Sequence, residues 1–230
     1  LIQAELDARR PGQAGDISST PRKEADQVKI LSGVFEGKST GQPIAFFIEN
    51  TSQNSGDYGK LKDIYRPGHA DYSWQQKFGV RDHRGGGRAS ARETAARVAG
   101  GGIALAFLKT QGIGVNAFCI EFGGLKAELV DPAGAGMRPF FSPSPEAAAR
   151  WQARVEEVRE AGETLGGVVQ IEAHGIPAGL GDPVFDGLDA RLGAAFLSVG
   201  AVKGVEFGAG FAAARLTGSE NNDILTAGGF

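Results

Sequence analysis

Residues able to do chemistry gather in one stretch of this sequence, residues 66–97, which reads RPGHADYSWQQKFGVRDHRGGGRASARETAAR. It holds six of the fifteen arginines and two of the three histidines. Seven cations against three carboxylates give the stretch a local charge of +4, although the whole chain carries −3. Such a concentrated positive patch on an acidic chain favours a compact, highly anionic ligand, because a long polyanion needs a broad basic surface.

The order of residues within the stretch predicts an anion site at the start of a helix. Gly85–Gly87 leave the backbone free to adopt positive φ and to approach a ligand closely. Ser90 then stands as an N-cap, with Glu93 at the capping-box spacing. The free N–H groups and the positive end of the helix dipole would lie beside Arg88 and Arg92, a favourable place for phosphate or carboxylate.

A purely structural interpretation of the same residues stays open. A glycine run before a helix is commonly only a turn, and arginines on a helix commonly form a solvated face. Arg97 fits this interpretation, because Glu93 lies four residues earlier on the same helical face and can pair with it. His69 and His83 favour a site instead, because two of only three histidines fall among the arginines.

The stretch, continued to VAGGG, resembles the central signature of the chorismate synthase family. Four further segments resemble the family in the same order along the chain: ARRPG at 8–12, VKILSGVFEGKSTGQPI at 28–44, GIPAGLGDPVFDGLDARL at 175–192, and VKGVEFGAGF through GSENND at 202–223. The resemblance therefore covers essentially the whole chain.

This resemblance implies an anti-1,4-elimination of phosphate from 5-enolpyruvylshikimate 3-phosphate, which gives chorismate in the shikimate pathway of aromatic amino acid biosynthesis. It implies reduced FMN as the cofactor of a lyase without net redox change. It also associates the chain with FAD and NADP, and makes NADPH a candidate reductant. The substrate carries a phosphate and two carboxylates and FMN another phosphate, so an arginine-dense pocket follows from their charge.

The resemblance also assigns roles position by position. His69, within PGHAD, matches the family histidine thought to protonate or neutralise the reduced flavin. The FMN-contacting positions match Arg88, Ala89, Ser90, Gly200 and Ala201. The positions that contact substrate or NADP match Arg9, Arg66 and Arg92. His83 falls where the family tolerates other residues, and no metal site is expected.

Local patterns predict a mixture of helices and strands. Strands are expected at 28–35, 43–48, 113–122, 165–173 and 202–207, and helices at 1–10, 91–112, 144–162 and 188–199. Three consecutive glycines, Gly100–Gly102, lie inside the second helix and indicate either a closely packed backbone or a kink. The resemblance implies an α+β fold, with helices sandwiched between antiparallel β-sheets in a single domain over residues 1–230, assembled as a homotetramer.

Family members carry a Ser-His-Gly motif with another catalytic histidine before this region, and Gly-Gly-Ile-Ser-like and Arg-His-Asp-Pro-Cys motifs after it. We therefore expect a domain incomplete at both ends, with little or no turnover alone. Cys119 is the only cysteine and lies in an apolar run, which indicates a core residue and a reducing compartment. With no apolar run of about 20 residues and no signal-peptide layout, we expect a cytoplasmic protein without membrane contact.

A non-catalytic phosphate- or anion-binding module is the alternative from another functional class. It would use the same arginines and the same glycine turn, but it has no use for His69. A nucleic-acid partner is not expected, because only Tyr72, Trp74 and Phe78 lie among the basic residues as a stacking platform. Tight FMN binding favours the enzyme, whereas oligonucleotide binding with a steep salt dependence favours the alternative.

Overall fold

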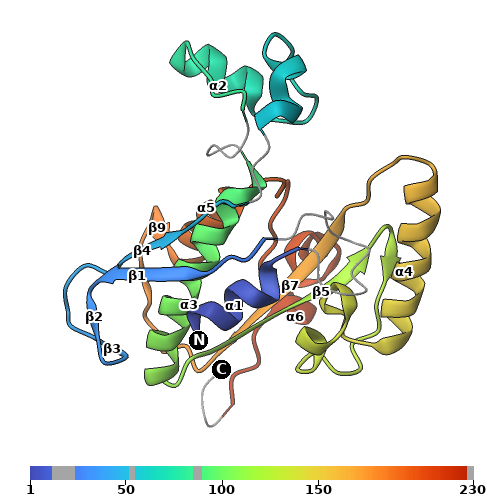
Figure 1. Ribbon diagram of the computed structural model, residues 1–230. Coiled ribbons are helices and arrows are strands. Elements are labelled where there is room, and N and C mark those ends of the chain that lie inside the picture. The colour runs from blue at the N-terminus through green and yellow to red at the C-terminus, as the bar shows by residue number, and fades with distance from the viewer. Residues whose placement is uncertain (12–23, 52–54, 85–89, 227–230) are drawn as a thin grey trace. The chain divides into compact units, whose positions relative to one another are not determined.

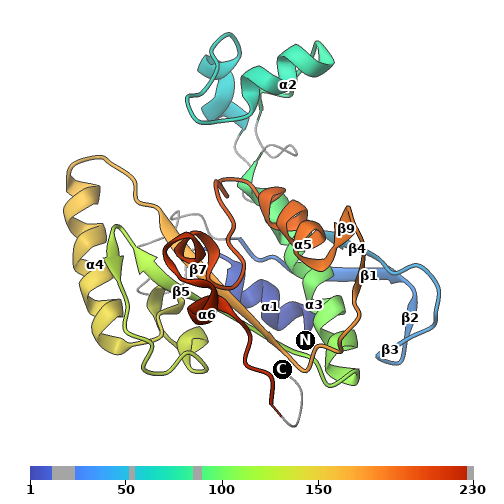
Figure 2. The same ribbon diagram turned by 180° about the vertical axis from the view of Figure 1, so that it is seen from behind.

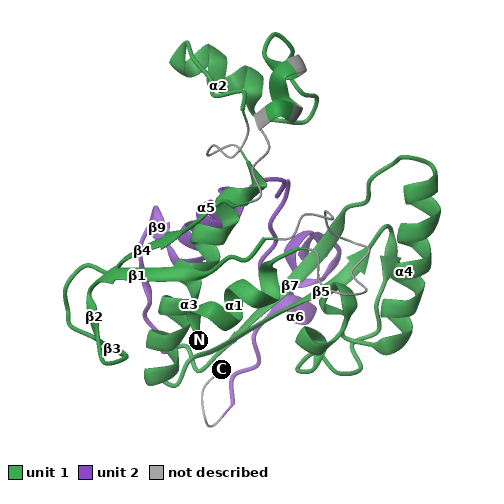
Figure 3. Ribbon diagram, in the orientation of Figure 1, with its two compact units in different colours: residues 1–176 green, residues 177–230 purple. Residues whose placement is uncertain are grey.

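The computed structural model describes residues 1–11, 24–51, 55–84 and 90–226. These residues fall into two compact units, Leu1–Ile176 and Pro177–Phe230 (Figure 3). Each unit contains helices, and the strand pairs within each are antiparallel. The α+β class predicted from the sequence is therefore confirmed.

The elements of the first unit follow one another along the chain from blue to orange in Figure 1. They are α1 (Ile2–Arg9), β1 (Val28–Ser32), β2 (Val34–Phe35), β3 (Lys38–Ser39), β4 (Ala45–Ile48), η1 (Ser55–Leu61), α2 (Asp71–Phe78), η2 (Ala91–Glu93), α3 (Thr94–Thr110), β5 (Gly114–Phe122), β6 (Leu125–Lys126), η3 (Ala135–Met137), η4 (Pro139–Phe141), α4 (Pro145–Glu160) and β7 (Gly167–His174), where η marks a 3-10 helix.

A first core forms where α1 meets α3. Leu6 is completely buried there against Ala95 and Ala99, whose small side chains let the two helices approach closely. The strands β1 and β4 pair antiparallel, with Val28 opposite Ile48 as the predicted strand pair requires, and their apolar residues pack against the same core. The sequence predictions of a short N-terminal helix and of this strand pair are confirmed.

The helix α3 runs without interruption through its three glycines. Gly102 is buried, and a Cβ atom added to it would lie 3.1 Å from the Cα atom of Ile2 in α1. A Cβ atom on Gly100 or Gly101 would instead have no neighbour within 4 Å. The close backbone approach predicted from the glycine run is therefore present, and it involves one of the three positions.

Alanine at Gly101 is expected to raise the free energy of unfolding by about 0.5–1 kcal/mol, because it restricts the unfolded chain without meeting a neighbour. Alanine at Gly102 should give no such gain, since the new methyl group must displace the backbone of α1. Urea unfolding of the two variants beside the parent measures the difference. Equal gains at both positions would contradict the close packing of α1 on α3.

A second core lies between α4 and the three-stranded sheet of order β6-β5-β7 (Figure 1). Trp151 of α4 is completely buried against Cys119 of β5 and Ala147. Burial raises the pKa of the Cys119 thiol, which agrees with the core role predicted for it. Ser144 begins α4 as predicted, because its hydroxyl oxygen accepts a hydrogen bond from the backbone N–H of Ala147 at 3.0 Å.

The second unit is smaller and is seen from behind in Figure 2. Its elements are β8 (Gly181–Asp182), β9 (Asp186–Gly187), α5 (Leu188–Leu197), η5 (Gly210–Arg215) and α6 (Gly218–Asn221). The strand predicted at 202–207 is wrong: these residues enter no ladder within the described part of the chain. The helix predicted at 188–199 is present as α5, but no residue of this helix is buried.

Candidate functional site

Two arginines that the sequence assigns to ligand binding meet at one buried carboxylate. Arg9 lies at the end of α1 and Arg92 lies in η2, the turn that precedes α3. Asp26, whose side chain has no exposed surface, accepts from Arg9 Nη1 at 2.8 Å through Oδ2 and from Arg92 Nη1 through Oδ1. Glu24 adds an acceptor 2.7 Å from Arg92 Nη1 and lies 3.7 Å from Arg9. We call these four residues the Asp26 cluster.

Further hydrogen bonds hold both guanidinium groups in place. Arg9 Nε donates to Thr94 Oγ1 at 3.1 Å, and Arg92 Nη2 donates to the carbonyl oxygen of Glu49 at 3.0 Å. Asp26 itself has a φ of 46°, in the left-handed region that Asp tolerates better than most residues. The cluster therefore joins α1, the segment before β1, the end of β4 and the start of α3.

The predicted helix start is present in a modified form. Ser90 is the N-cap, but the first turn is the 3-10 helix η2, and Ser90 Oγ accepts from the backbone N–H of Arg92 at 3.2 Å. Glu93 pairs with Arg97 at 2.5 Å, as the structural interpretation predicted, so its carboxylate serves this ion pair rather than a capping box. Arg88 and Ala89, together with the glycine run, lie outside the described residues.

Carboxylates compensate much of the positive charge predicted for residues 66–97. Beside the Asp26 cluster and the pair of Glu93 with Arg97, Arg84 makes two hydrogen bonds to Asp82, both 2.8 Å long. The sequence count overlooked Glu24 and Asp26, which lie 42 and 40 residues before the start of the stretch. The described arginines of this stretch are therefore held in fixed positions by partners within the chain. An anion that binds there would contact guanidinium groups that are already oriented and already paired with carboxylates.

His69 and Arg66 lie in a second group, centred on Asp71 at the start of α2. Arg66 makes a two-pronged contact with Asp71, with Nε 2.8 Å from Oδ2 and Nη2 3.0 Å from Oδ1. The Nδ1 atom of His69 lies 3.2 Å from Arg66 Nη2 and 3.1 Å from Asp71 Oδ1. The structure thus brings two predicted site residues together, around an acid that the sequence argument did not select although it lies two residues after His69.

Arg81 also contacts this second group and ties it to the residues that follow η1. Its Nη2 atom donates to the carbonyl oxygens of Leu61, Lys62 and Ile64 at 2.8 to 2.9 Å, just after η1. Its guanidinium lies over the ring of Tyr65, and Nη1 is 3.5 Å from Asp71 Oδ1. In the sequence analysis Arg81 was one of the cations of the positive patch. In the structure it links the end of η1 to the start of α2.

The hydrogen bonds from Arg66 hold the pKa of the Asp71 carboxyl far below its usual range. A carboxyl with a depressed pKa in the folded state contributes stability that is complete above its ordinary value of about 3.9. As the pH falls below about 4, the unfolded chain takes up this proton first. The difference in free energy of unfolding between the parent and Asp71→Asn should therefore be smaller at pH 3 than at pH 5, as urea unfolding at these two values can measure.

Gly200 and Ala201 lie in the exposed turn after α5, in the second unit. Ala201 has a φ of 71°, unusual for a residue with a side chain. A Cβ atom on Gly200 would meet nothing within 4 Å. Their role as flavin contacts stays a prediction, but the turn presents backbone and open space as such contacts would need.

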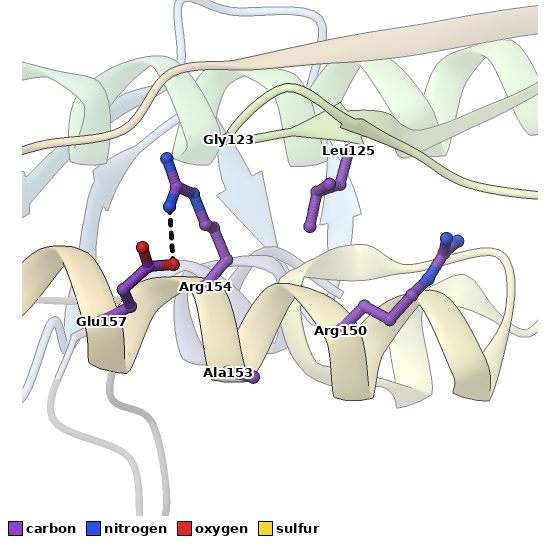
Figure 4. A pocket seen from close by; sticks show the side chains of 6 residues that line it. All are labelled: Gly123, Leu125, Arg150, Ala153, Arg154 and Glu157. Atoms are coloured by element: carbon purple, nitrogen blue, oxygen red, sulfur yellow. Dashed lines mark hydrogen bonds and ion pairs between the residues drawn. The ribbon is translucent and has the colours of Figure 1, made fainter.

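An open hollow of about 500 Å³ lies between α4 and the turn joining β5 to β6 (Figure 4). It is lined by Gly123, Leu125, Arg150, Ala153, Arg154 and Glu157, and so by none of the predicted site residues. Arg154 pairs with Glu157 at 2.5 Å, and Arg150 donates to the carbonyl oxygen of Lys126 at 3.0 Å. Both cations already have partners in the chain, so we regard the hollow as a surface feature.

Two negative findings apply to the described ranges. No three His, Cys, Asp or Glu side chains within them gather in a way that could hold a metal ion. None of their helices combines the length and the apolar character that a membrane crossing requires.

Comparison with known proteins identifies the family. A family model described as chorismate synthase matches residues 1–229. The chorismate synthases of Oleidesulfovibrio alaskensis and Nitratidesulfovibrio vulgaris (strain DP4) are 62% and 61% identical to the chain over 230 residues, which are all of this chain and 64% of each relative.

A crystal structure of a chorismate synthase agrees in fold, with a TM-score of 0.80 and 35% identity over 98% of this chain and 64% of that chain. The chain thus spans slightly less than two thirds of the length of the relatives it matches. The resemblance read from residues 66–97 is confirmed along the whole sequence: this chain belongs to the chorismate synthase family.

Proposed function

We propose that the protein converts 5-enolpyruvylshikimate 3-phosphate to chorismate by anti-1,4-elimination of phosphate, as a lyase of aromatic amino acid biosynthesis. Family membership over residues 1–229 supports this assignment. The observation that carries it is the Asp26 cluster, in which Arg9 and Arg92 converge from segments 83 residues apart beside the N-cap Ser90. Convergent guanidinium groups at a helix start suit a substrate with one phosphate and two carboxylates.

The chain's own residues would divide the work of binding and proton handling. Arg9 and Arg92 are held by buried carboxylates, so they orient a bound anion without themselves having to reorganise. Arg66 keeps its Nη1 group without a hydrogen-bond partner among the described residues, which leaves donors for the substrate. His69, held by Arg66 through Nδ1, would neutralise charge on the reduced flavin by donating a hydrogen bond through Nε2.

Reduced FMN is the proposed cofactor, and it would supply an electron-rich ring next to the substrate. Ser90 fits a contact with it, because its hydroxyl oxygen is occupied as an acceptor while its hydrogen has no acceptor among the described residues. Gly200 and Ala201 are separately proposed as backbone contacts, on the open space beside the turn. Arg88 and Ala89 remain proposed contacts from the family pattern, as do FAD and NADP associations and NADPH as reductant.

The broader biological setting is also part of the proposal. A single domain built from both units, a homotetrameric assembly and a cytoplasmic location follow from the family resemblance. The alternative of a non-catalytic anion-binding module is less favoured, because it has no use for His69 and because family membership over residues 1–229 supports the enzyme.

The decisive experiment measures chorismate formation with anaerobically reduced FMN and 5-enolpyruvylshikimate 3-phosphate. We expect turnover by the polypeptide encoded by the complete gene, and little or none by the 230-residue chain, which lacks the family's other histidine. FMN titration of both should show binding that the substrate strengthens. Absence of turnover in the complete, folded polypeptide, or oligonucleotide binding with a steep salt dependence in place of flavin binding, would overturn the proposal.

A further inference from the structure

The side chains of Arg66 and Asp71 both approach one ring nitrogen of His69, Nδ1, to within 3.2 Å. We propose that Asp71 is a positioning residue for His69: by clamping Arg66 it directs a guanidinium N–H at Nδ1, and so keeps the neutral imidazole in its Nε2–H tautomer. The use of that tautomer in proton handling rests on the proposed function, whereas the tautomer itself follows from contacts within residues 66–71.

Asp71 is well placed to fix the orientation of Arg66. Its side chain is only 5% exposed. Its Oδ2 atom accepts from Arg66 Nε at 2.8 Å and from the backbone N–H of Arg66 at 3.2 Å, and its Oδ1 atom accepts from Nη2 at 3.0 Å. A two-pronged contact of this kind fixes the plane of the guanidinium as well as its position.

The second hydrogen of Arg66 Nη2 determines the tautomer. Nη2 lies 3.2 Å from His69 Nδ1 with geometry suited to a hydrogen bond. Because a guanidinium only donates, Nδ1 must accept, and a neutral imidazole whose Nδ1 is unprotonated carries its hydrogen on Nε2. No described residue forms a hydrogen bond with Nε2, so this N–H group is available to a ligand.

The doubly protonated ring would need a small rearrangement, because an N–H group on Nδ1 would face the N–H group of Arg66 Nη2 at 3.2 Å. Asp71 Oδ1, 3.1 Å from Nδ1, would then supply the counter-charge. Arg81 Nη1, 3.5 Å from the same oxygen, is the other charged group facing it, and it stabilises Asp71 as the carboxylate. Nε2 therefore keeps its hydrogen in both protonation states, and His69 acts toward a ligand as an N–H donor.

A rival geometry makes a distinct claim. If Asp71 accepted a hydrogen bond from Nδ1–H of the neutral ring, Nε2 would be unprotonated and His69 would act as a base toward the ligand. In that arrangement an N–H group of Arg66 would point at the N–H group of the ring, which is unfavourable at 3.2 Å. The contacts therefore favour the Nε2–H tautomer.

The test is histidine-selective ¹⁵N labelling of the full chain, with long-range ¹H–¹⁵N correlation spectra recorded above pH 8 without flavin or substrate. The His69 signals are assigned with His69→Gln. We expect the Nε2–H pattern in the parent, and in Asp71→Asn a measurable share of Nδ1–H, because the clamp on Arg66 is weakened. An Nδ1–H pattern in the parent, or an Asp71→Asn spectrum identical to the parent, would overturn the proposal.

Asp82→Asn is a matched control, because Asp82 binds Arg84 through the same pattern of Nε, Nη2 and backbone N–H without contacting His69. It should leave the His69 signals unchanged. If Asp71→Asn does not fold, Arg66→Lys replaces it, since lysine keeps the charge but loses the fixed fork. The spectra do not depend on turnover, so a failure of the proposed function leaves this test intact.

In the complete polypeptide, Asp71→Asn should lower kcat by about 10- to 100-fold, as expected for a lost positioning contact of His69, and any rise in KM through the loosened Arg66 should be smaller than that fall. Asp82→Asn should change neither. A loss confined to KM would indicate that Asp71 serves substrate binding and would contradict the positioning role.

Discussion

Asparagine in place of Asp26 is expected to lower the free energy of unfolding by about 3 kcal/mol. Asp26 is the fully buried acceptor shared by Arg9 and Arg92, which are themselves only 18% and 12% exposed. Removing the charge leaves two largely buried cations with Glu24 as their remaining carboxylate, 11% exposed. Breaking a buried ion pair is costly because the unmatched charge stays out of water, and Glu24 keeps the loss at the lower end of the usual range.

Urea unfolding monitored by circular dichroism measures this change. Asparagine is the informative replacement, because it tolerates the φ of 46° at this position and isolates the effect of charge. Alanine should cost a further 1 kcal/mol or so through backbone strain. Glu157→Gln is the control, since Glu157 is 68% exposed and pairs with Arg154 at the surface, where the loss should stay below about 1 kcal/mol. A loss at Asp26 no larger than this control would refute the buried arrangement.

Truncation of Trp151 to alanine is expected to lower the free energy of unfolding by about 4 kcal/mol. The ring is completely buried between the sheet and η4, with the rings of Phe122 and Phe140 centred 6.1 and 6.2 Å away. Its Nε1–H group donates to the carbonyl oxygen of Leu125 at 2.8 Å. The variant therefore loses aromatic packing, opens a cavity and leaves a buried acceptor without its donor.

Trp151→Phe separates these contributions, because it keeps most of the ring but removes the hydrogen bond, and it should cost about 1–3 kcal/mol. Met137→Ala, at a side chain 91% exposed, should stay within about 0.5 kcal/mol of the parent. The midpoint of urea unfolding should shift while its slope stays the same. Equal losses for Trp151→Ala and Met137→Ala would show that this core does not form as described.

The sequence predicted a helix or strand correctly where the residues that determine it are neighbours in the chain. Ser144 followed by proline began α4, because the capping hydroxyl and the missing N–H act within one turn. The strand prediction at 202–207 was wrong for the opposite reason. Its apolar and β-branched residues favour extended backbone, but a strand also needs a neighbouring strand, which sequence spacing does not reveal.

The sequence predicted the arginines of the site but not the carboxylates that hold them. Arginines stand out in the composition of residues 66–97, and the family pattern selected Arg9 and Arg92 individually. Their partner Asp26 lies outside that stretch, and only the folded chain places it between them. Asp71 could have been found, because its position two residues after His69 and five after Arg66 puts all three within reach of one turn.

Arg81 gives the peptide from Leu61 to Asp71 an internal scaffold, since a single guanidinium ties three carbonyl oxygens to the start of α2. Arg66 and His69 both lie within this peptide, so the contacts of Arg81 restrict the position of one relative to the other. The spacing between the imidazole and the guanidinium of Arg66 is therefore set within residues 61–81, by Asp71 and Arg81.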